Sequence, residues 1–380
     1  MKVINLNNIN GSFDYLIVGS GLFGAVCANE LSKKGFSVLV VEKRENVGGN
    51  IYTKTFENIT THVYGAHIFH TSNKDIWNYI NCFASFNNFV NSPIARYKDE
   101  CYNLPFNMNT FSKLWNNVIT PDQAKRRIQE ERNCVSFENP QNLEEQAINM
   151  VGKTIYEKLI KGYTSKQWGK PCSELPASII KRIPVRYTYN NNYFDDLYQG
   201  IPVGGYTKII EQMLLNSTVV LNCDFLKHRE ILSSFAKKII YTGQIDAFFG
   251  FKFGPLEYRS LRFEHEVLNI EDFQGVAVVN YTDSETLFTR IIEHKHFESV
   301  VSQKTIITRE YPQKWEIGLE PYYPINDRAN TKLYSMYIEE AKKIPNIVFC
   351  GRLGSYKYSD MDETIENALN LVKSLEGKDN

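Results

Sequence analysis

The sequence predicts an α/β fold in which a discontinuous parallel-sheet domain carries an inserted helical domain and an antiparallel β-sheet domain. Three observations predict it. The apolar segment 15–18 leads through a glycine-rich turn and a helix-forming stretch to a second apolar segment, 37–41, which indicates a strand–helix–strand unit. Between about 256 and 320 the apolar residues recur with a period of two, as in half-buried antiparallel strands. An apolar segment at 346–350 and an amphipathic helix at 360–375 then return to the opening pattern, so the C-terminus closes the first domain.

Composition limits the classes of function. The chain has 380 residues, which allows two or three compact units, and its 43 basic and 43 acidic residues balance. No overall field therefore attracts nucleic acid or an anionic membrane. The sequence has no signal-peptide core and no apolar run near the roughly 18 residues that span a bilayer. Seven scattered cysteines without a C-x-x-C pair suit reduced thiols, so we expect a cytoplasmic protein.

A glycine motif opens the first helix and predicts a dinucleotide site. Gly19, Gly21 and Gly24 have G-x-G-x-x-G spacing directly after the first strand. In order, these positions allow a tight turn, a close backbone approach to a pyrophosphate, and close packing of helix on strand. The helix N-terminus offers free N–H groups to phosphates. Glu42 ends the second strand, where a carboxylate can accept ribose hydroxyls. The alternative, a plain strand–helix–strand turn, is disfavoured by this framing.

A second glycine pair favours FAD over NAD. Gly48 and Gly49 follow Glu42 after the basic pair Lys43-Arg44. NAD-dependent dehydrogenases usually continue here into another strand–helix–strand unit, whereas flavoproteins often carry a glycine pair where backbone passes close to the cofactor. We therefore expect the first domain to be a Rossmann-like FAD-binding domain.

Two histidines, His67 and His70, follow in Y-G-A-H-I-F-H-T. Their spacing would suit metal ligands on a helix, but no matching cysteine, histidine or carboxylate cluster accompanies them, so we expect no metal. The sequence leaves open whether they are hydrogen-bonded core residues or cofactor contacts.

A polar segment with glycine and proline at its ends, Lys161–Pro171, is expected to be a mobile loop. Tyr163 and Trp168 in it could stack on a base or sugar, or could cover a core edge.

Arginines form the remaining candidate group. Arg182, Arg186 and Arg290 offer planar forks that suit phosphate oxygens, although each alone could be a surface ion pair. Arg290 stands in an apolar strand, where an unpaired charge is costly, so a ligand or carboxylate must satisfy it. Arg352 follows a strand-ending glycine and points to the cofactor, while Asp360 could simply cap the last helix.

Together these segments resemble the bacterial UDP-galactopyranose mutases over nearly the full chain, from about residue 14 to 375. The motifs that carry the resemblance are D-Y-L-I-V-G-S-G, G-A-H-I-F-H-T, G-Y-T-S-K-Q-W-G, E-L-P-A-S-I-I-K-R-I-P-V-R, N-N-Y-F, G-I-P-V-G-G-Y-T, T-R-I-I-E-H-K-H-F, E-P-Y-Y-P and G-R-L-G-S-Y-K-Y-S-D-M-D. The resemblance implies interconversion of UDP-galactopyranose and UDP-galactofuranose by FAD without net redox change, supplying galactofuranose for cell-surface glycans. It implies that N5 of the reduced flavin forms a covalent adduct with the sugar. A cofactor nucleophile would explain why no Ser-His, Cys-His or carboxylate pair stands out.

The resemblance also implies roles for individual residues. Arg182 and Arg290 would clamp the diphosphate from opposite sides, and His67 would lie against the flavin. The implied substrate contacts are Tyr163 at the uracil, Trp168 over the substrate, Tyr193, Tyr323 and Tyr358 at the phosphates, and Asp360. The expected cofactor contacts are Gly19, Gly21, Phe23, Gly24, Glu42, Lys43, Gly49, Asn50, His67, Arg352, Asp360 and Met361.

Three sites depart from the family pattern. Ala66 replaces a usual proline, Leu159 and Ile160 replace two phenylalanines of some relatives, and Gln244 replaces a common proline. Without the phenylalanines, the base would be held by apolar contact. None of these changes touches the arginine pair, so turnover is still expected.

Domain limits and partners complete the expectations. The FAD-binding domain is expected at 1–80, 205–255 and 335–380, the helical domain with its mobile loop at 100–185, and the sheet domain at 81–99, 186–204 and 256–334. The expected partners are the UDP-sugars, reduced nicotinamide or another electron donor, and a second copy of the chain in a homodimer. Two alternatives stay open, namely a flavin oxidoreductase of the amine-oxidase type and a UDP-sugar-binding protein without catalysis.

Overall fold

The protein is described from a computed structural model that covers residues 1–135, 137–182 and 184–376, without the side chains of Lys181, Arg182 and Glu376. The chain folds into two compact units. The first unit contains Met1–Asn88, Asp196–Tyr258 and the described part of Ile317–Asn380, and the second contains the described parts of Phe89–Asp195 and Arg259–Glu316. Each unit is therefore assembled from segments that are distant in sequence.

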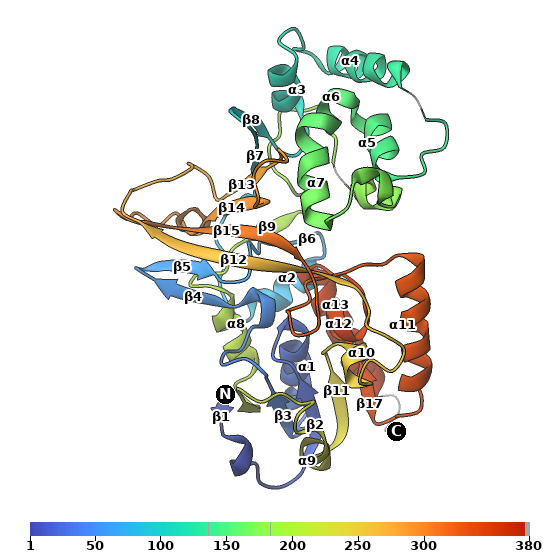
Figure 1. The fold of residues 1–380 in the computed structure, drawn as a ribbon. Helices are drawn as coiled ribbons and strands as arrows, with labels where there is room; N and C mark the ends of the chain where they lie inside the picture. Colours follow the sequence, from blue (N-terminus) through green and yellow to red (C-terminus); the bar gives the residue numbers. More distant parts are fainter. Residues whose placement is uncertain (136, 183, 377–380) are drawn as a thin grey trace. The chain divides into compact units, whose positions relative to one another are not determined.

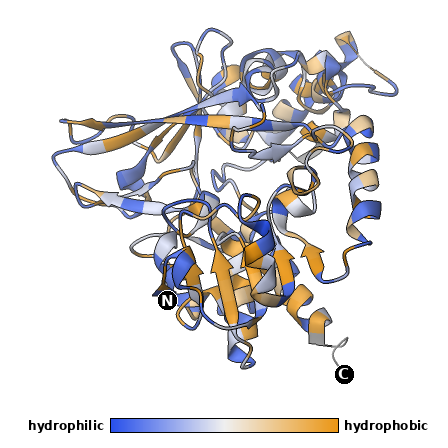
Figure 2. Ribbon diagram, turned by 60° about the horizontal axis from the view of Figure 1, so that its bottom comes forward, coloured by the Kyte–Doolittle hydropathy of each residue, from blue (hydrophilic) through white to orange (hydrophobic). Residues whose placement is uncertain are grey.

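Among the described residues, the first unit is built on a six-stranded parallel sheet in the order β1-β10-β3-β2-β11-β17 (Figure 1). Its strands are β1 (Lys2–Val3), β2 (Phe13–Val18), β3 (Val38–Val41), β10 (Thr218–Val220), β11 (Ala236–Tyr241) and β17 (Ile347–Phe349). Figure 2 shows these strands largely in the colour of hydrophobic residues, as expected for a parallel sheet covered on both faces. The predicted fold class is thus confirmed, including the return of the chain to this sheet.

The register of the central strands brings their carboxyl ends to one edge. Val18 of β2 pairs with both Val41 of β3 and Tyr241 of β11. The residues that follow these three, including Gly19 and Glu42, consequently emerge side by side. This is the edge where open α/β sheets bind their ligands.

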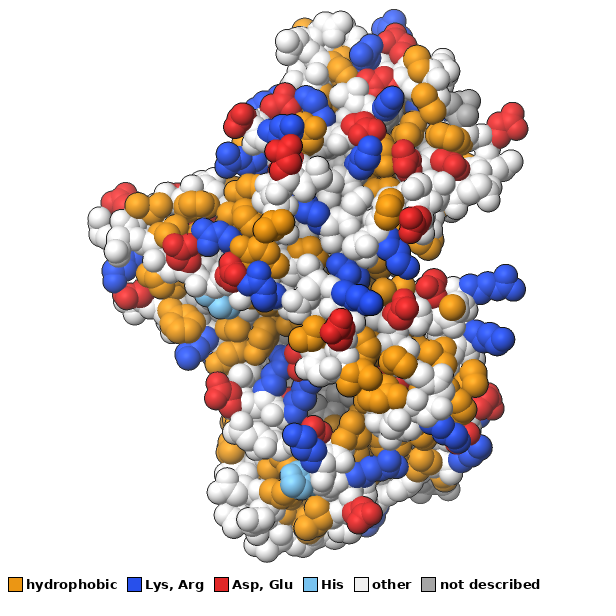
Figure 3. All heavy atoms as spheres, in the orientation of Figure 1, with side chains coloured by type: hydrophobic (Ala, Val, Ile, Leu, Met, Phe, Trp, Pro, Cys, Tyr) orange, Lys and Arg blue, Asp and Glu red, His pale blue; other side chains and the backbone are white. Residues whose placement is uncertain are grey.

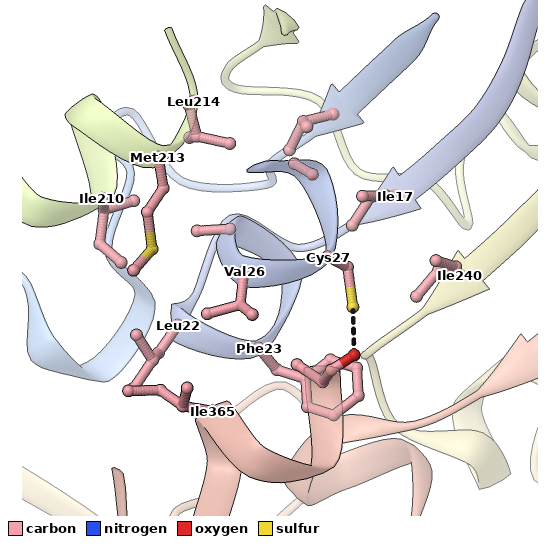
Figure 4. Packing of buried hydrophobic residues seen from close by; sticks show 14 of the residues in the cluster. Ile17, Leu22, Phe23, Val26, Cys27, Ile210, Met213, Leu214, Ile240 and Ile365 are labelled. Carbon is pink, nitrogen blue, oxygen red and sulfur yellow. Dashed lines mark hydrogen bonds between the residues drawn. The ribbon is translucent and has the colours of Figure 1, made fainter. Parts of the chain in front are cut away.

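Helix α1 (Leu22–Lys33) is buried along most of its length, since it packs on the sheet and against α8 (Tyr206–Met213) and α13 (Met361–Glu376). Figure 4 shows Val26 and Cys27 of this helix among side chains from the sheet and from both neighbouring helices. The Cys27 thiol lies 4.0 Å from the carbonyl oxygen of Ala368. Burial raises the pKa of this thiol, which therefore stays protonated and unreactive, so Cys27 is a packing residue.

Gly24 sets the distance between α1 and the turn before it. A Cβ atom at Gly24 would lie 2.1 Å from the carbonyl oxygen of Gly19 and 3.2 Å from Cγ2 of Ile17. Gly19 has φ +101°, which favours glycine. The motif therefore has the steric role expected from the sequence.

The other elements of the first unit surround this sheet. Two small antiparallel pairs are β4 (Thr53–Phe56) with β5 (Ile59–His62), and β6 (Phe69–Thr71) with β9 (Tyr198–Gly200). The remaining elements are α2 (Lys74–Asn81), α9 (Arg229–Ser234), α10 (Ile245–Phe248), β16 (Tyr323–Pro324), α11 (Arg328–Ala341) and α12 (Gly351–Gly354).

The second unit combines a sheet with a group of helices (Figure 1). Its strands lie in the order β12-β15-β14-β13-β7-β8, and neighbours are antiparallel except for β13 with β7. They are β7 (Ile94–Tyr97), β8 (Glu100–Asn103), β12 (Tyr258–Leu268), β13 (Val278–Tyr281), β14 (Arg290–Glu293) and β15 (Thr305–Lys314). The region 256–320, which was expected to form antiparallel strands, is interrupted after β14, because His294–Phe297 forms a 3-10 turn, η6.

The helices of the second unit enclose a core of their own. They are α3 (Met108–Leu114), α4 (Pro121–Cys134), α5 (Leu143–Val151), α6 (Lys153–Ile155), the π-helix η3 (Tyr156–Ile160), α7 (Lys161–Trp168) and the 3-10 helices η4 (Cys172–Glu174) and η5 (Ala177–Arg182). Helix α4 begins with a capping box formed by Thr120 and Gln123. The helices and the sheet, expected as separate domains, belong here to one compact unit, and their further division stays a prediction.

The surface charges agree with the equal numbers of basic and acidic residues, and the helices agree with the lack of a long apolar run in the sequence. On the face that Figure 3 shows, basic and acidic side chains are intermixed with hydrophobic ones. Among the helices of the described chain, none is long and apolar enough to cross a membrane.

Replacement of Gly24 by alanine tests the close packing of α1. The added methyl group would overlap backbone that cannot rotate away, so we expect the free energy of unfolding to fall by about 3 kcal/mol. The matched control is Lys33→Ala in the same helix, whose side chain is 53% exposed and which should change stability by less than about 0.5 kcal/mol. Urea unfolding of both variants measures this, and equal stability of G24A and the wild type would contradict it.

Candidate cofactor and substrate site

A cavity of about 360 Å³ lies at the carboxyl ends of the strands in the first unit. It is lined by most of the residues that the sequence assigned to the cofactor, namely Gly19, Gly21, Phe23, Gly24, Glu42, Lys43, Gly49, Asn50, His67, Arg352 and Met361. Asp360, the remaining expected cofactor residue, is not among the lining residues. The structure thus brings the two glycine motifs, the acid after β3 and the start of α13 to one place.

Glu42 is buried and is held by the turn that it faces. Its Oε2 atom accepts hydrogen bonds from the backbone N and the hydroxyl of Ser20, both at 2.8 Å. Its Oε1 atom accepts from the backbone N of Arg44 at 2.9 Å. A carboxylate offers about four acceptor sites, so Glu42 retains capacity for a ribose hydroxyl while it joins β3 to the glycine turn.

Two glycines form a narrow cradle in the cavity. A Cβ atom at Gly21 would meet only the Cα atom of Gly49, at 3.9 Å, and a Cβ at Gly49 would lie 3.0 Å from the Cα of Gly21. Because neither residue has a side chain, a ligand can approach the backbone N–H groups at the start of α1. This geometry fits a pyrophosphate of a dinucleotide such as FAD.

Arg44 supplies an unused donor in the same cavity. Its Nη2 atom donates to Asn50 at 3.3 Å and to Glu320 at 3.2 Å, and its guanidinium lies 4.4 Å from the centre of the Tyr64 ring. The buried Nη1 atom has no hydrogen-bond partner in the described chain. A bound anionic group would satisfy this donor, which is a second observation in favour of a phosphate-bearing cofactor.

Several cavity residues were not assigned from the sequence. Lys43 forms an ion pair of 2.5 Å with Glu320, and burial of Glu320 is outweighed by Lys43 and Arg44, which lower its pKa. Gln244, one of the departures from the family pattern, also lines the cavity. Further unassigned residues include Cys223, Asp224, Phe225, Leu226, Thr242, Gly243 and Pro321. The E-P-Y-Y-P motif contained Glu320 and Pro321, but spacing alone does not place a distant loop beside a strand end.

The two histidines after the glycine pair have different surroundings. His67 lines the cavity, and its Nδ1 atom lies 2.8 Å from the carbonyl oxygen of Gly65. His70 belongs to β6, and its Nδ1 atom lies 2.7 Å from a carboxylate oxygen of Asp196. These separate surroundings give no support to a metal ion shared by His67 and His70. Of the two interpretations that the sequence left open, core residues or cofactor contacts, the structure favours a cofactor contact for His67 alone.

The start of α13 gathers several expected residues in the first unit. Arg352 donates to the carbonyl oxygens of Tyr322 and Ser359, at 3.3 and 3.2 Å, and lies 4.7 Å from the centre of the Tyr358 ring. The Tyr358 hydroxyl donates to Asp360 at 3.0 Å. The rings of Tyr323 and Tyr358 are 5.9 Å apart. Arg352 is thus fixed by carbonyls, with its guanidinium at the cavity wall.

In the second unit, Arg290 at the start of β14 contacts a tyrosine and a glutamate. Arg290 donates through Nη2 to the hydroxyl of Tyr163 at 2.5 Å, and its Nε atom lies 3.3 Å from Oε1 of the buried Glu310. Burial raises the pKa of Tyr163, and the charge of Arg290 opposes this shift. The carboxylate required by the sequence argument for Arg290 is therefore Glu310.

Other expected substrate residues lie in the second unit as well. Arg186 donates to the carbonyl oxygen of Tyr193 at 3.1 Å and forms a 2.6 Å ion pair with Asp195, so it orders this segment. Burial raises the pKa of Tyr193. The side chain of Arg182 lies outside the described residues, and its role stays a prediction.

The segment expected to be a mobile loop is largely helix α7, with Trp168 as its last residue. Gly162, which suggested a loop, serves close packing, since a Cβ atom there would lie 2.3 Å from the carbonyl oxygen of Thr282. Gly169 ends the helix with φ +66°. The expectation of a loop is therefore wrong for residues 161–168.

Lys166 and Arg259 attach α7 to the sheet of the second unit. The Nζ atom of Lys166 donates to three carbonyl oxygens between β13 and β14, those of Tyr281, Thr286 and Phe288, at 2.9, 2.9 and 3.1 Å. Burial lowers the pKa of Lys166 to about 8. Arg259 donates to the carbonyl oxygen of Gln167 at 2.8 Å and so caps the carboxyl end of the helix.

The π-helix η3 immediately precedes α7. Leu159 and Ile160, which stand where some relatives have phenylalanines, are 5% and 2% exposed and belong to the helical core. They therefore offer little surface to a base. Such single π-turns are frequent at functional sites.

Comparison with known proteins finds relatives over most of the chain. A family model described as UDP-galactopyranose mutase matches residues 158–358, and one described as NAD(P)-binding Rossmann-like domain matches residues 17–83. The chain is 40% identical to a probable UDP-galactopyranose mutase of Klebsiella pneumoniae, over 96% of this chain and 94% of that protein. It is 35% identical to the dTDP-fucopyranose mutase of Escherichia coli, over 94% and 97%.

A solved structure adds the fold. The crystal structure of a reduced UDP-galactopyranose mutase superimposes with a TM-score of 0.72 at 15% identity, over 96% of this chain and 94% of that chain. At this identity, the likeness concerns the fold alone.

Replacement of Glu42 by alanine tests the cofactor cavity. Loss of the carboxylate leaves the donors of Ser20 and Arg44 without their acceptor, so we expect the Kd for FAD to rise about 10- to 100-fold, or about 1.4–2.8 kcal/mol. Glu45→Ala, at an exposed position in the same segment, is the matched control and should bind FAD as the wild type does. Titration of the apoprotein with FAD, followed by flavin fluorescence, distinguishes them, and equal affinities would refute the role of Glu42.

Replacement of Lys166 by methionine tests the attachment of α7. Three carbonyl oxygens lose their shared donor, so we expect the free energy of unfolding to fall by about 3 kcal/mol. Lys161→Met, an exposed position in the same helix, should change it by less than about 0.5 kcal/mol. Urea unfolding gives both values, and limited proteolysis should cut the K166M variant first between β13 and β14 or in α7.

Proposed function

The chain belongs to the UDP-galactopyranose mutase family, and we propose that it interconverts UDP-galactopyranose and UDP-galactofuranose. The observation that carries the proposal is the Arg290–Tyr163–Glu310 cluster, a half-buried cation on a strand of the second unit. A flavin oxidoreductase of the amine-oxidase type has no evident need for such a cation beside a tyrosine. A mutase needs it, because it must release UDP and recapture it.

FAD is the cofactor, and the cavity of the first unit fits it. The Gly21–Gly49 cradle and the unused Nη1 donor of Arg44 would hold the pyrophosphate, and Glu42 would accept from the ribose. A bound, reduced flavin would supply nucleophilic chemistry at the anomeric carbon of the sugar. His67 and Arg352, on the cavity wall, would orient the cofactor.

Arg290 would bind the diphosphate of the nucleotide. Glu310 lies beside the Nε atom of its guanidinium and Tyr163 accepts a hydrogen bond from Nη2, so the planar group is oriented from two sides, and a guanidinium suits phosphate oxygens. A positioned cation stabilises the charge that develops on UDP as the anomeric bond breaks, and it keeps UDP close for its return. Arg182, Trp168, Tyr193, Tyr323, Tyr358 and Asp360 are proposed as further substrate contacts.

A second candidate substrate is a dTDP-linked 6-deoxy sugar. A relative that is 35% identical over 94% of this chain is named a dTDP-fucopyranose mutase. The two substrates differ in a methyl group on the base, in the ribose 2′-hydroxyl and in the sugar 6-hydroxyl. With Leu159 and Ile160 buried in the core, the base contact falls to Tyr163, and its ring alone would stack on either pyrimidine.

The compartment, oligomeric state and electron donor of the enzyme are also proposals. We propose a cytoplasmic homodimer whose flavin is kept reduced by a nicotinamide or another electron donor. All seven cysteines are free in the structure, which agrees with a reducing compartment.

The decisive experiment is turnover of UDP-galactofuranose with and without dithionite, with products separated by chromatography. We expect UDP-galactopyranose only when the flavin is reduced, with no electrons consumed per turnover. A parallel reaction with dTDP-fucofuranose ranks the two substrates by kcat/KM. Conversion of neither sugar by a reduced protein that still binds UDP would leave a binding protein without catalysis.

Replacement of Arg290 by lysine tests the proposed cation. Lysine keeps the charge but cannot bridge Glu310, Tyr163 and a phosphate at once, so we expect kcat/KM to fall about 100-fold or more. The control is Arg309→Lys in the neighbouring strand β15, whose partner is the exposed Glu266, and it should stay within about twofold of the wild type. Flavin content is measured on both variants, and full activity of R290K would contradict the proposal.

A further inference from the structure

Three potential metal ligands meet in the second unit, apart from the cluster around Arg290. His296 lies in the 3-10 turn η6 and Glu293 ends strand β14, while Asp272 lies in the connection between β12 and β13. Their ligand atoms all lie within 4.8 Å of one another. We propose that these three residues bind one divalent transition-metal ion of the Zn²⁺ type.

The spacing of the ligand atoms suits such an ion. The Nε2 atom of His296 lies 3.3 Å from Oδ2 of Asp272 and 3.3 Å from Oε2 of Glu293. Ligands about 2.0–2.1 Å from a tetrahedral zinc ion are separated by about 3.3 Å, so an ion can occupy the position between these atoms without moving them far. A water molecule would complete the four-coordinate site.

The histidine nitrogen faces both carboxylates. Nε2 of His296 is buried and lies 3.3 Å from an oxygen of each acid, and Glu293 above all, together with Asp272, raises the pKa of His296 although burial opposes this shift. A proton on this nitrogen therefore competes with a metal ion for the lone pair. A metal ion between the three atoms would use the nitrogen lone pair and both carboxylates together.

Glu293 is held as metal-binding carboxylates are usually held. It is fully buried, and its Oε1 atom accepts from the hydroxyl of Thr305 at 2.6 Å and from the backbone N of Phe273 at 2.9 Å. Its Oε2 atom accepts from the backbone N of Gln274 at 2.8 Å, with capacity left toward His296. Such surrounding donors orient a ligand before the ion arrives.

The charges favour a divalent cation. Asp272 and Glu293 contribute two negative charges, which a divalent ion neutralises once it displaces the proton of the imidazole. The nearest described cation on the same turn is Lys295, whose Nζ atom donates to the carbonyl oxygen of Glu271 instead of to the cluster. The ion would join the connection before β13 to the end of β14, the strand that begins with Arg290.

Titration of the EDTA-treated, full-length protein with Co²⁺ tests the site. We expect one equivalent to give the weak visible bands of nitrogen and oxygen ligation, without the intense near-ultraviolet band of thiolate that Cys82, Cys101 or Cys134 would produce. Competition with Zn²⁺ should abolish these bands. Saturating Zn²⁺ should raise the thermal unfolding midpoint.

Two ligand variants and one control decide the outcome. His296→Gln and Asp272→Asn, at positions that are not fully buried, should each weaken Co²⁺ binding about 100-fold or more. His228→Gln, at an exposed histidine of the first unit, should bind as the wild type does. Absence of a stoichiometric Co²⁺ spectrum, or an unchanged spectrum in the folded H296Q variant, would overturn the proposal and leave His296 as an ion-pair partner of the two carboxylates.

Discussion

The close approach of α1 to the turn after β2 is the constraint on which the first unit depends. Gly24 packs against the carbonyl of Gly19, so the helix begins at the edge of the sheet and its free N–H groups reach the cavity. Glu42 then ties β3 to the same turn through Ser20. A helix displaced by the width of one methyl group would break these hydrogen bonds and fill the cradle between Gly21 and Gly49.

The second unit must stabilise the charged side chain of Arg290 on the apolar strand β14. Glu310 and Tyr163 satisfy Arg290 from two directions, and Tyr163 stands on a helix that Lys166 and Arg259 attach to the sheet. The guanidinium is therefore oriented by residues of the chain itself. Preorganised charge of this kind is worth more than a flexible cation, because no reorganisation is needed during the reaction.

Much of the fold could be predicted from the sequence, because its signals are local. The glycine spacing, the apolar strands 15–18 and 37–41 and the capping box at Thr120 depend on neighbouring residues, and the structure has them. The helix α7 was mistaken for a loop because Gly162 has a tertiary role, namely contact with the carbonyl of Thr282. Likewise, η6 interrupts an apparently continuous strand, and its His296 meets Asp272 only in three dimensions.

The candidate site shows the same division. Residues inside a motif, such as Gly49 and His67, could be assigned, whereas Glu320 reaches Lys43 and Arg44 from nearly 280 residues away. The spacing of residues in the sequence does not predict such a distant contact. For Arg290 the sequence required either a ligand or a carboxylate, because an apolar strand excludes an unpaired charge, and it did not identify Glu310.

The discontinuity of the first unit also bears on the order in which the protein can be made. Strand β2 lies between β3 and β11, and β11 in turn pairs with β17, whose residues Ile347–Phe349 leave the ribosome after all the segments of the second unit. Until then one edge of this apolar parallel sheet is unpaired, a state that invites association with other chains. The segments of the second unit emerge earlier, so the nascent chain must complete an insert while the domain that carries it is still open.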